Sequence, residues 1–141
     1  MANLLEDLEL YFTNLNATSE ICTNFGTTFT SNTNLFLVVE PASPTNSVTI
    51  IPYGGVPPST RHTYAQYPSV QIRIKNESLP TGMLTGQSVI NAMHMNDRVG
   101  SNIPMKCFAK QSNPIFLKYD EEDYPVWVVN FDVMHVKHSV S

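Results

Sequence analysis

The strongest constraint on the fold of this chain is the two-residue alternation in YPSVQIRIK, residues 67–75. From Val70 onward, apolar and polar side chains take turns along the segment. The apolar set is Val70, Ile72 and Ile74, and the polar set is Gln71, Arg73 and Lys75. Successive side chains of a β-strand point to opposite faces of its sheet, so this pattern predicts a strand with one buried face and one open face.

Several other segments are typical of strands, because they are short, rich in β-branched and aromatic residues, and bounded by turn residues. They span residues 35–40, 47–53, 103–110, 113–120 and 126–136. The spacer between the first two has hairpin length, so we expect these two strands to pair antiparallel. In the last segment, alternation places one set of large apolar side chains on a single face. This set is Trp127, Val129, Phe131 and Val133.

Two segments, residues 3–15 and 81–97, have the three- and four-residue apolar spacing of amphipathic helices. The stripe expected in the second comprises Met83, Leu84, Val89 or Ile90, and Met93. Residues 16–34 are mostly Asn, Thr and Ser, so we expect a loop or an irregular edge segment there. The pattern predicts an α+β fold, a mostly antiparallel β-sheet with two α-helices packed on one face. Its length predicts a single domain, residues 1–141.

Charge is scarce in this chain and unevenly placed. Charged residues make up 14% of the sequence, against roughly 25% in an ordinary soluble domain. Twelve acids outnumber eight bases, and the four consecutive acids Asp120 to Asp123 account for the whole net charge of −4. The bases are scattered, which argues against direct nucleic-acid binding through phosphate neutralisation. A neutral surface rich in hydrogen-bonding groups suits a protein whose surface is mostly in contact with other proteins.

The acidic run Asp120 to Asp123 is the first candidate for a metal site or a catalytic carboxylate cluster. A calcium loop needs acids at alternate positions, a central Gly and a distant bidentate Glu. Here the acids are consecutive, and neighbouring side chains of an extended segment point to opposite sides, so they do not converge on one ion. We therefore expect a solvated turn between two strands.

Nothing else in the sequence predicts catalysis. There is no G-x-S-x-G elbow and no glycine-rich phosphate loop, and the histidines belong to no local catalytic signature. Cys22 and Cys107 stand far apart, and the N-terminus lacks the basic segment of a secretory signal, so we expect two free thiols. We therefore predict a protein that is not an enzyme and uses no cofactor or metal.

The loop over residues 54–67 has a composition suited to protein–protein contact. It contains one charged residue, and aromatic and imidazole side chains lie within it and at its start. These are Tyr53, His62, Tyr64 and Tyr67. A loop with no binding role is the alternative interpretation.

Taken in order, these motifs resemble the tail terminator and minor capsid proteins of tailed bacteriophages. The first matching motif is the alternating strand, where the family form is met at Pro68, Val70, Gln71 and Arg73, with Lys75 in place of a final Arg. The second closes the chain and comprises Pro114, Leu117, Asp120, Asn130 and Phe131. The resemblance covers residues 35–136 and the first helix in kind, and it leaves out residues 16–34.

The resemblance implies a structural virion protein that performs no chemistry. It implies a homo-hexameric ring that caps the head-proximal end of the tail tube, terminates tail polymerisation and forms the docking surface for the head–tail connector. The implied partners are further copies of the chain, the tail tube protein, the connector protein and, in a contractile tail, the sheath protein. DNA only passes through such a ring, no membrane is involved, and assembly takes place in the host cytoplasm.

We expect the protein–protein contacts to use the loop, the open strand face and the closing motif. The candidates are Tyr53, His62, Tyr64, Tyr67, Arg73, Lys75, Asp120, Asn130 and Asp132. The acids Asp120, Glu121, Glu122 and Asp123 are candidates for the channel wall, where they would repel DNA phosphates. Two alternatives stay open: a neighbouring head–tail connector of the adaptor or stopper type, and a small metal-binding enzyme that uses residues 120–123.

Overall fold

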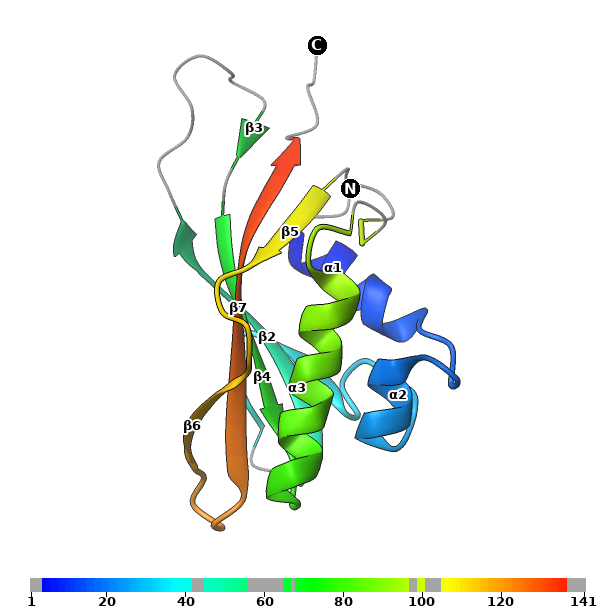
Figure 1. Cartoon of the computed structure of the whole chain (residues 1–141), viewed down its shortest axis with the longest axis vertical. Helices are drawn as coiled ribbons and strands as arrows, with labels where there is room; N and C mark the ends of the chain where they lie inside the picture. The colour runs from blue at the N-terminus through cyan, green and yellow to red at the C-terminus, as the bar shows by residue number, and fades with distance from the viewer. Residues whose placement is uncertain are drawn as a thin grey trace.

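The computed structural model describes residues 4–41, 45–55, 65–66, 68–96, 99–100 and 105–136, which form one sheet with its helices on one side (Figure 1). The helices are α1 (Leu4–Thr13), α2 (Glu20–Phe25) and α3 (Leu79–Met93). The strands are β1 (Leu35–Leu37), β2 (Ser47–Gly55), β3 (Ala65–Gln66), β4 (Pro68–Lys75), β5 (Met105–Ala109), β6 (Ile115–Tyr119) and β7 (Pro125–Val136). The predicted α+β fold, with a mostly antiparallel sheet and its helices on one face, is confirmed.

Strand β7 organises the sheet because it is long enough to pair along both of its edges. One edge pairs with β4 and, near Val136, with β3. The other edge pairs with β6 near Pro125 and with β5 farther along. All four pairings are antiparallel, and the sheet continues from β4 through β2 to β1. Strands β1 and β6 therefore lie at opposite edges of the sheet.

The prediction of an antiparallel hairpin between residues 35–40 and 47–53 is wrong. β1 and β2 pair in parallel, with Leu35 opposite Val48 and Leu37 opposite Ile50. The chain leaves β1 at Val38, which adopts a left-handed φ of 71° and so turns the backbone sharply. Spacer length alone suggested a hairpin. Because β1 has only three residues, however, the same spacer is also long enough to run back along β1 and start a parallel strand beside it.

Residues 16–34 contain helix α2, where the sequence pattern predicted a loop or an irregular edge segment. Its N-cap is Ser19, whose Oγ accepts a hydrogen bond from the Cys22 N–H at 3.3 Å. It ends at Gly26, whose φ of 108° is a left-handed conformation that glycine adopts without a steric penalty. A helix of this length is marginal by itself, and the burial of Ile21 and Phe25 against the core stabilises it.

The core fills the space between the sheet and the helices. The alternation in β4 is confirmed, because Val70, Ile72 and Ile74 are all fully buried. Along β7, Val129, Phe131 and Val133 are buried in the same layer, and Trp127 packs against it while half-buried. Helix α3 packs on these two strands, α2 packs against α3, and α1 packs on β1 and β2.

Helix α3 contacts the sheet through small residues as well as large ones. Val89, Ile90 and Met93 are buried as predicted, but Met83 and Leu84 are exposed. The close approach to the sheet occurs at Gly82, where a Cβ would lie 2.7 Å from Cδ1 of Trp127 in β7. In the described part of the chain, every helix falls short of the length and apolar character that a membrane span needs.

Candidate protein interface on the outer face of the sheet

The face of the sheet opposite the helices, called the outer face below, gathers most of the described candidate residues. Tyr53 of β2, Arg73 and Lys75 of β4, and Asn130 and Asp132 of β7 all belong to it. The antiparallel register between β4 and β7 causes this, because it pairs each polar position of β4 with an outward position of β7. Of the remaining candidates, Asp120 lies in the turn after β6, and His62, Tyr64 and Tyr67 lie outside the described residues.

Side-chain hydrogen bonds cross the middle of the outer face from β2 to β7. The amide oxygen Oδ1 of Asn130 accepts from the Tyr53 hydroxyl at 3.3 Å and from Nε2 of Gln71 at 3.2 Å. Gln71 in turn accepts from Nε of Arg73 at 2.7 Å. These bonds link three strands and hold polar side chains in fixed rotamers, so the surface is ordered before any partner binds.

The Asp132 end of the outer face is more open to solvent. Oδ1 of Asp132 accepts from the Ser69 hydroxyl at 2.7 Å and lies 3.7 Å from the ammonium of Lys110. The side chains of Asp132 and Lys110 are 55% and 45% exposed. An exposed ion pair of this kind contributes little to stability, and both charges stay accessible to a protein partner.

At the opposite end, Lys75 is buried and acts as a clamp. Its side chain is 1% exposed, and its Nζ donates to the Pro41 carbonyl oxygen at 2.6 Å and lies 3.4 Å from Oδ2 of Asp120. Lys75 therefore fixes both the chain after β1 and the turn after β6 to the sheet. Because Lys75 is itself buried, it shapes the outer face by fixing the positions of these two segments.

The acidic turn is built around Asp120. Its Oδ1 accepts the backbone N–H groups of Glu122 at 2.9 Å and Tyr124 at 2.8 Å. Burial raises the pKa of Asp120, but the two N–H donors and the Lys75 ammonium outweigh burial and lower the pKa below its ordinary value. The next three residues, Glu121 to Asp123, are exposed, and Asp123 adopts a left-handed φ of 65° in a tight turn.

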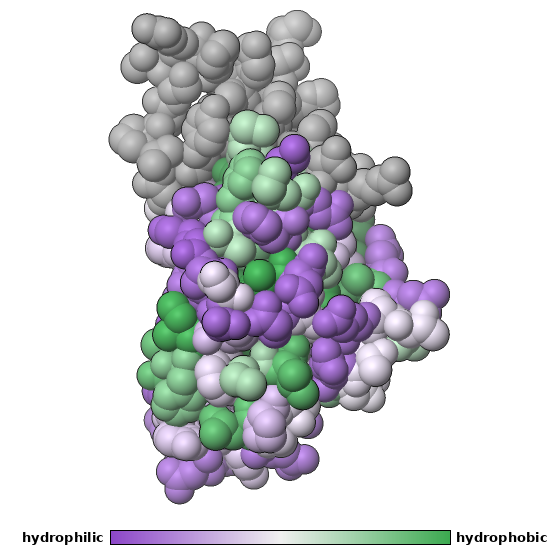
Figure 2. Space-filling view, viewed as in Figure 1, coloured by the Kyte–Doolittle hydropathy of each residue, from purple (hydrophilic) through white to green (hydrophobic). Residues whose placement is uncertain are grey.

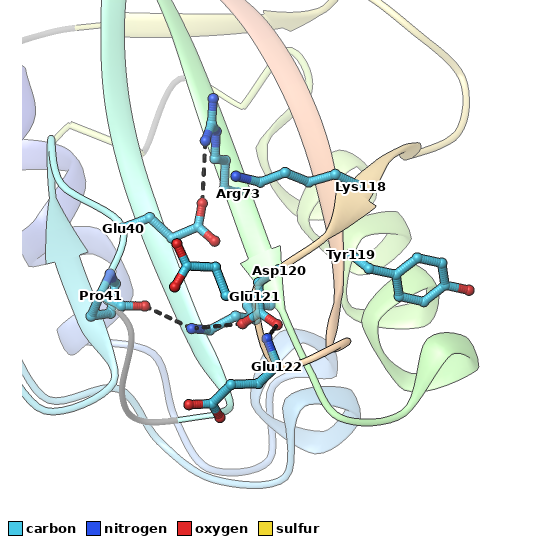
Figure 3. Close-up of a pocket in the computed structure, with 9 residues that line it drawn as sticks. Glu40, Pro41, Arg73, Lys118, Tyr119, Asp120, Glu121 and Glu122 are labelled. Atoms are coloured by element: carbon cyan, nitrogen blue, oxygen red, sulfur yellow. Dashed lines mark hydrogen bonds and ion pairs between the residues drawn. The ribbon is translucent and has the colours of Figure 1, made fainter.

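A pocket of about 380 Å³ lies between the chain after β1 and the acidic turn (Figure 3). Its lining residues are Glu40, Pro41, Arg73, Lys75, Lys118, Tyr119, Asp120, Glu121 and Glu122. NH1 of Arg73 pairs with Glu40 at 3.2 Å inside it, and the Tyr119 side chain points away. The mixed lining suits a polar or charged side chain of a partner. Among the described residues, no three His, Cys, Asp or Glu side chains group in a way that could hold a metal ion.

Sequence reasoning missed several residues of this face. Ser69 could have been found, since it has the same parity as Gln71 in the alternating strand. Glu40 gave no signal, because its place beside Arg73 depends on the parallel path of the chain after β1. Lys110 gave none either, since it follows β5 in a segment predicted only as strand.

Comparison with known proteins identifies a family and a similar fold. The family model described as "Bacteriophage tail terminator protein" matches residues 13–135. The fold is similar to a chain in the solved structure "Virion of native gene transfer agent (GTA) particle", with a TM-score of 0.68 and 12% sequence identity over 94% of each chain. At this identity the likeness shows a shared fold alone. No curated protein matches the sequence.

Proposed function

As the chain belongs to the bacteriophage tail terminator family and is a structural protein of the virion, we propose that it forms a homo-hexameric ring on the head-proximal end of the tail tube. The ring ends polymerisation of the tube protein and then provides the surface to which the head–tail connector binds. The ring assembles in the host cytoplasm.

The observation that carries this proposal is the outer face. Within the described residues it is free of helices, and its central polar side chains are already bonded to one another. A surface with preset rotamers loses little side-chain entropy when a partner binds. We assign this face to contact with a protein that stacks on the ring along the tail axis, the tail tube protein in the first place.

Capping requires no bond making or breaking. A tube grows because each added layer exposes a copy of the surface to which it was itself added. The contact between layers is therefore heterologous, and growth is open-ended. A ring that matches the last layer on one side and has no tube-like surface on the other stops the addition. The same asymmetry leaves the second side available to the connector.

The exposed acids Glu121, Glu122 and Asp123 fit a position on the channel wall. Carboxylates repel the phosphates of DNA, so a wall that carries them lets DNA pass without binding it. We include this placement in the proposal.

The test uses purified protein and tail tubes assembled without it. Wild-type protein is expected to bind tube ends, seen by negative-stain electron microscopy and by co-sedimentation. Asp132→Lys reverses a charge on the outer face and is expected to weaken co-sedimentation by about tenfold. Thr23→Lys, on an exposed position of α2, is the matched control and is expected to bind as the wild type does.

The alternative assignment is a head–tail connector of the adaptor or stopper type. It predicts binding to the portal-side proteins of the head and none to tail tubes. A pull-down against each partner separates the two assignments. A protein that stays monomeric and ignores tail tubes contradicts the proposed function.

A further inference from the structure

Strand β6 is an exposed apolar edge whose side chains project to both faces of the sheet. Its register with β7 places Phe116 opposite Trp127 on the helix side and Ile115 opposite Val128 on the outer side. All five of its side chains are exposed, among them Ile115 at 48%, Phe116 at 39% and Leu117 at 41%. Figure 2 shows hydrophobic residues gathered over β6 and the lower part of α3. Single exposed apolar residues are ordinary, but several of them along one strand at the edge of a sheet mark a contact site.

On the helix side, the apolar edge continues from Phe116 onto the start of α3. Phe116 packs edge-on against Trp127, with ring centroids 5.6 Å apart, and Nε1 of Trp127 donates to the Leu79 carbonyl oxygen at 3.1 Å. Leu79 and Met83 are each 43% exposed. These contacts fix the apolar side chains on the helix side of this edge. We name the group of Ile115, Phe116, Leu117, Leu79 and Met83 the β6 patch.

The backbone of β6 is also available. In the described part of the chain, β6 pairs with β7 alone, and the pairing is irregular between Phe116 and Lys118. Its second edge therefore offers N–H and C=O groups to another chain. Edge strands that must avoid association carry charges, yet Lys118 is the single charged residue of this strand.

A second apolar surface lies at the opposite edge of the same sheet, at the corner that follows β1. Val38 is 52% exposed and Val39 is 71% exposed. The backbone there is held in place, since the Val38 N–H donates to the Ile50 carbonyl at 2.9 Å and the Val39 N–H donates to the Leu37 carbonyl at 2.8 Å. The corner is thus ordered and projects two apolar side chains, and the β6 patch is the apolar surface at the other edge of the sheet.

We propose that the β6 patch of one subunit binds the Val38–Val39 corner of the next subunit. The occupant is a second copy of this chain, because the chain itself carries two different apolar surfaces on opposite edges of one sheet. A contact between unlike surfaces is heterologous, and it closes into a ring when the rotation per subunit allows. This inference rests on the proposed ring and names the surfaces that build it. A tube protein bound at the β6 patch would leave the Val38–Val39 corner without a role.

The test is disulfide trapping with the double variant Val39→Cys/Leu117→Cys. Both native cysteines are free and at most 2% exposed, so they do not compete. Mild oxidation of the assembled protein is expected to give a ladder of covalent multimers on non-reducing gels, up to the full ring. An equal mixture of the two single variants is expected to give covalent dimers and no longer species.

The controls separate the arrangements that could bury the β6 patch. Leu117→Cys alone is expected to remain monomeric on the gel, and covalent dimers from it would show a like-with-like contact and overturn the inference. Thr23→Cys/Leu117→Cys, which moves the first cysteine to an exposed position of α2, is expected to give no ladder.

Light scattering on the same samples distinguishes failure of this inference from failure of the proposed function. A multimer in solution or on tube ends without cross-linking of the double variant overturns the inference alone. A chain that is monomeric under all conditions overturns the proposed ring and this inference together.

Discussion

The two faces of strand β7 differ in chemistry: one carries buried apolar side chains and the other carries hydrogen-bonded polar side chains. Toward the helices, Val129 and Phe131 are fully buried in an apolar core. Toward the outer face, Asn130 and Asp132 alternate with them and are held by hydrogen bonds to side chains of β2 and β4. The first set excludes water and has few directional contacts, whereas the second set has directional contacts and stays accessible.

The difference separates stability from recognition. Burial of apolar surface contributes about 25 cal/mol per Å² and is indifferent to orientation, while a hydrogen bond contributes about 1 kcal/mol net and fixes geometry. Changes on the helix side should therefore lower the free energy of unfolding, and changes on the outer face should alter binding more than stability. Four predictions test this separation.

The largest effect is expected for Phe131→Ala. Phe131 is fully buried in the core, so truncation removes apolar contacts and leaves a cavity, at a cost of about 3–5 kcal/mol in the free energy of unfolding. Urea denaturation measures the loss. The control is Asp132→Ala, the next residue on the opposite face, for which a loss below about 1 kcal/mol is expected. Equal losses in the two variants would refute the comparison.

Lys75 is a charged residue of the outer face whose side chain is nevertheless buried. Lys75→Met keeps the aliphatic stem but removes the charge that faces Asp120 and the donor to Pro41, at a cost of about 1.5–3 kcal/mol in the free energy of unfolding. Lys118→Met is the matched control, since Lys118 is exposed at the same pocket. A change within about 0.5 kcal/mol is expected for it. If both variants unfold alike, Lys75 is not the clamp described.

The lowered pKa of Asp120 gives the acidic turn a pH-dependent contribution. Ionised Asp120 favours the folded state at any pH above its ordinary pKa of 3.8, and the contribution is lost as the pH falls through the lower pKa of the folded state. Stability of the wild type should therefore fall more steeply below about pH 4 than that of Asp120→Asn. Denaturation midpoints across this range measure the two slopes. Parallel slopes would show that other carboxylates dominate.

The smallest effect is expected at the pair of Arg73 and Glu40, whose side chains are 28% and 14% exposed. A double-mutant cycle with Arg73→Ala and Glu40→Ala should give a coupling energy of about 0.2–1 kcal/mol, because partly solvated ion pairs contribute little. Arg73→Ala should weaken co-sedimentation with tail tubes more than it lowers the free energy of unfolding. A coupling energy above about 2 kcal/mol would contradict this prediction and would show that the pair stabilises the fold as strongly as the buried Lys75 does.

Much of the fold could be predicted from the sequence where periodicity was strong. The alternation of β4 and β7 identified the buried set and the outward set correctly, and these two strands supply four of the outer-face candidates. Helix α2 escaped prediction, because its Thr and Asn content is typical of loops and its stability comes from packing. The β6 patch escaped as well, since an apolar run such as Ile115–Leu117 is usually buried.

By itself, the sequence determined which residues share a face along each strand, because the two-residue period of an extended chain is a local property. It also determined that the acidic run Asp120 to Asp123 forms a turn. The tertiary structure alone decided the parallel pairing of β1 with β2, the burial of Lys75 against Asp120, and the exposure of β6. These features join segments distant in the chain, and their stability depends on contacts that no local pattern records.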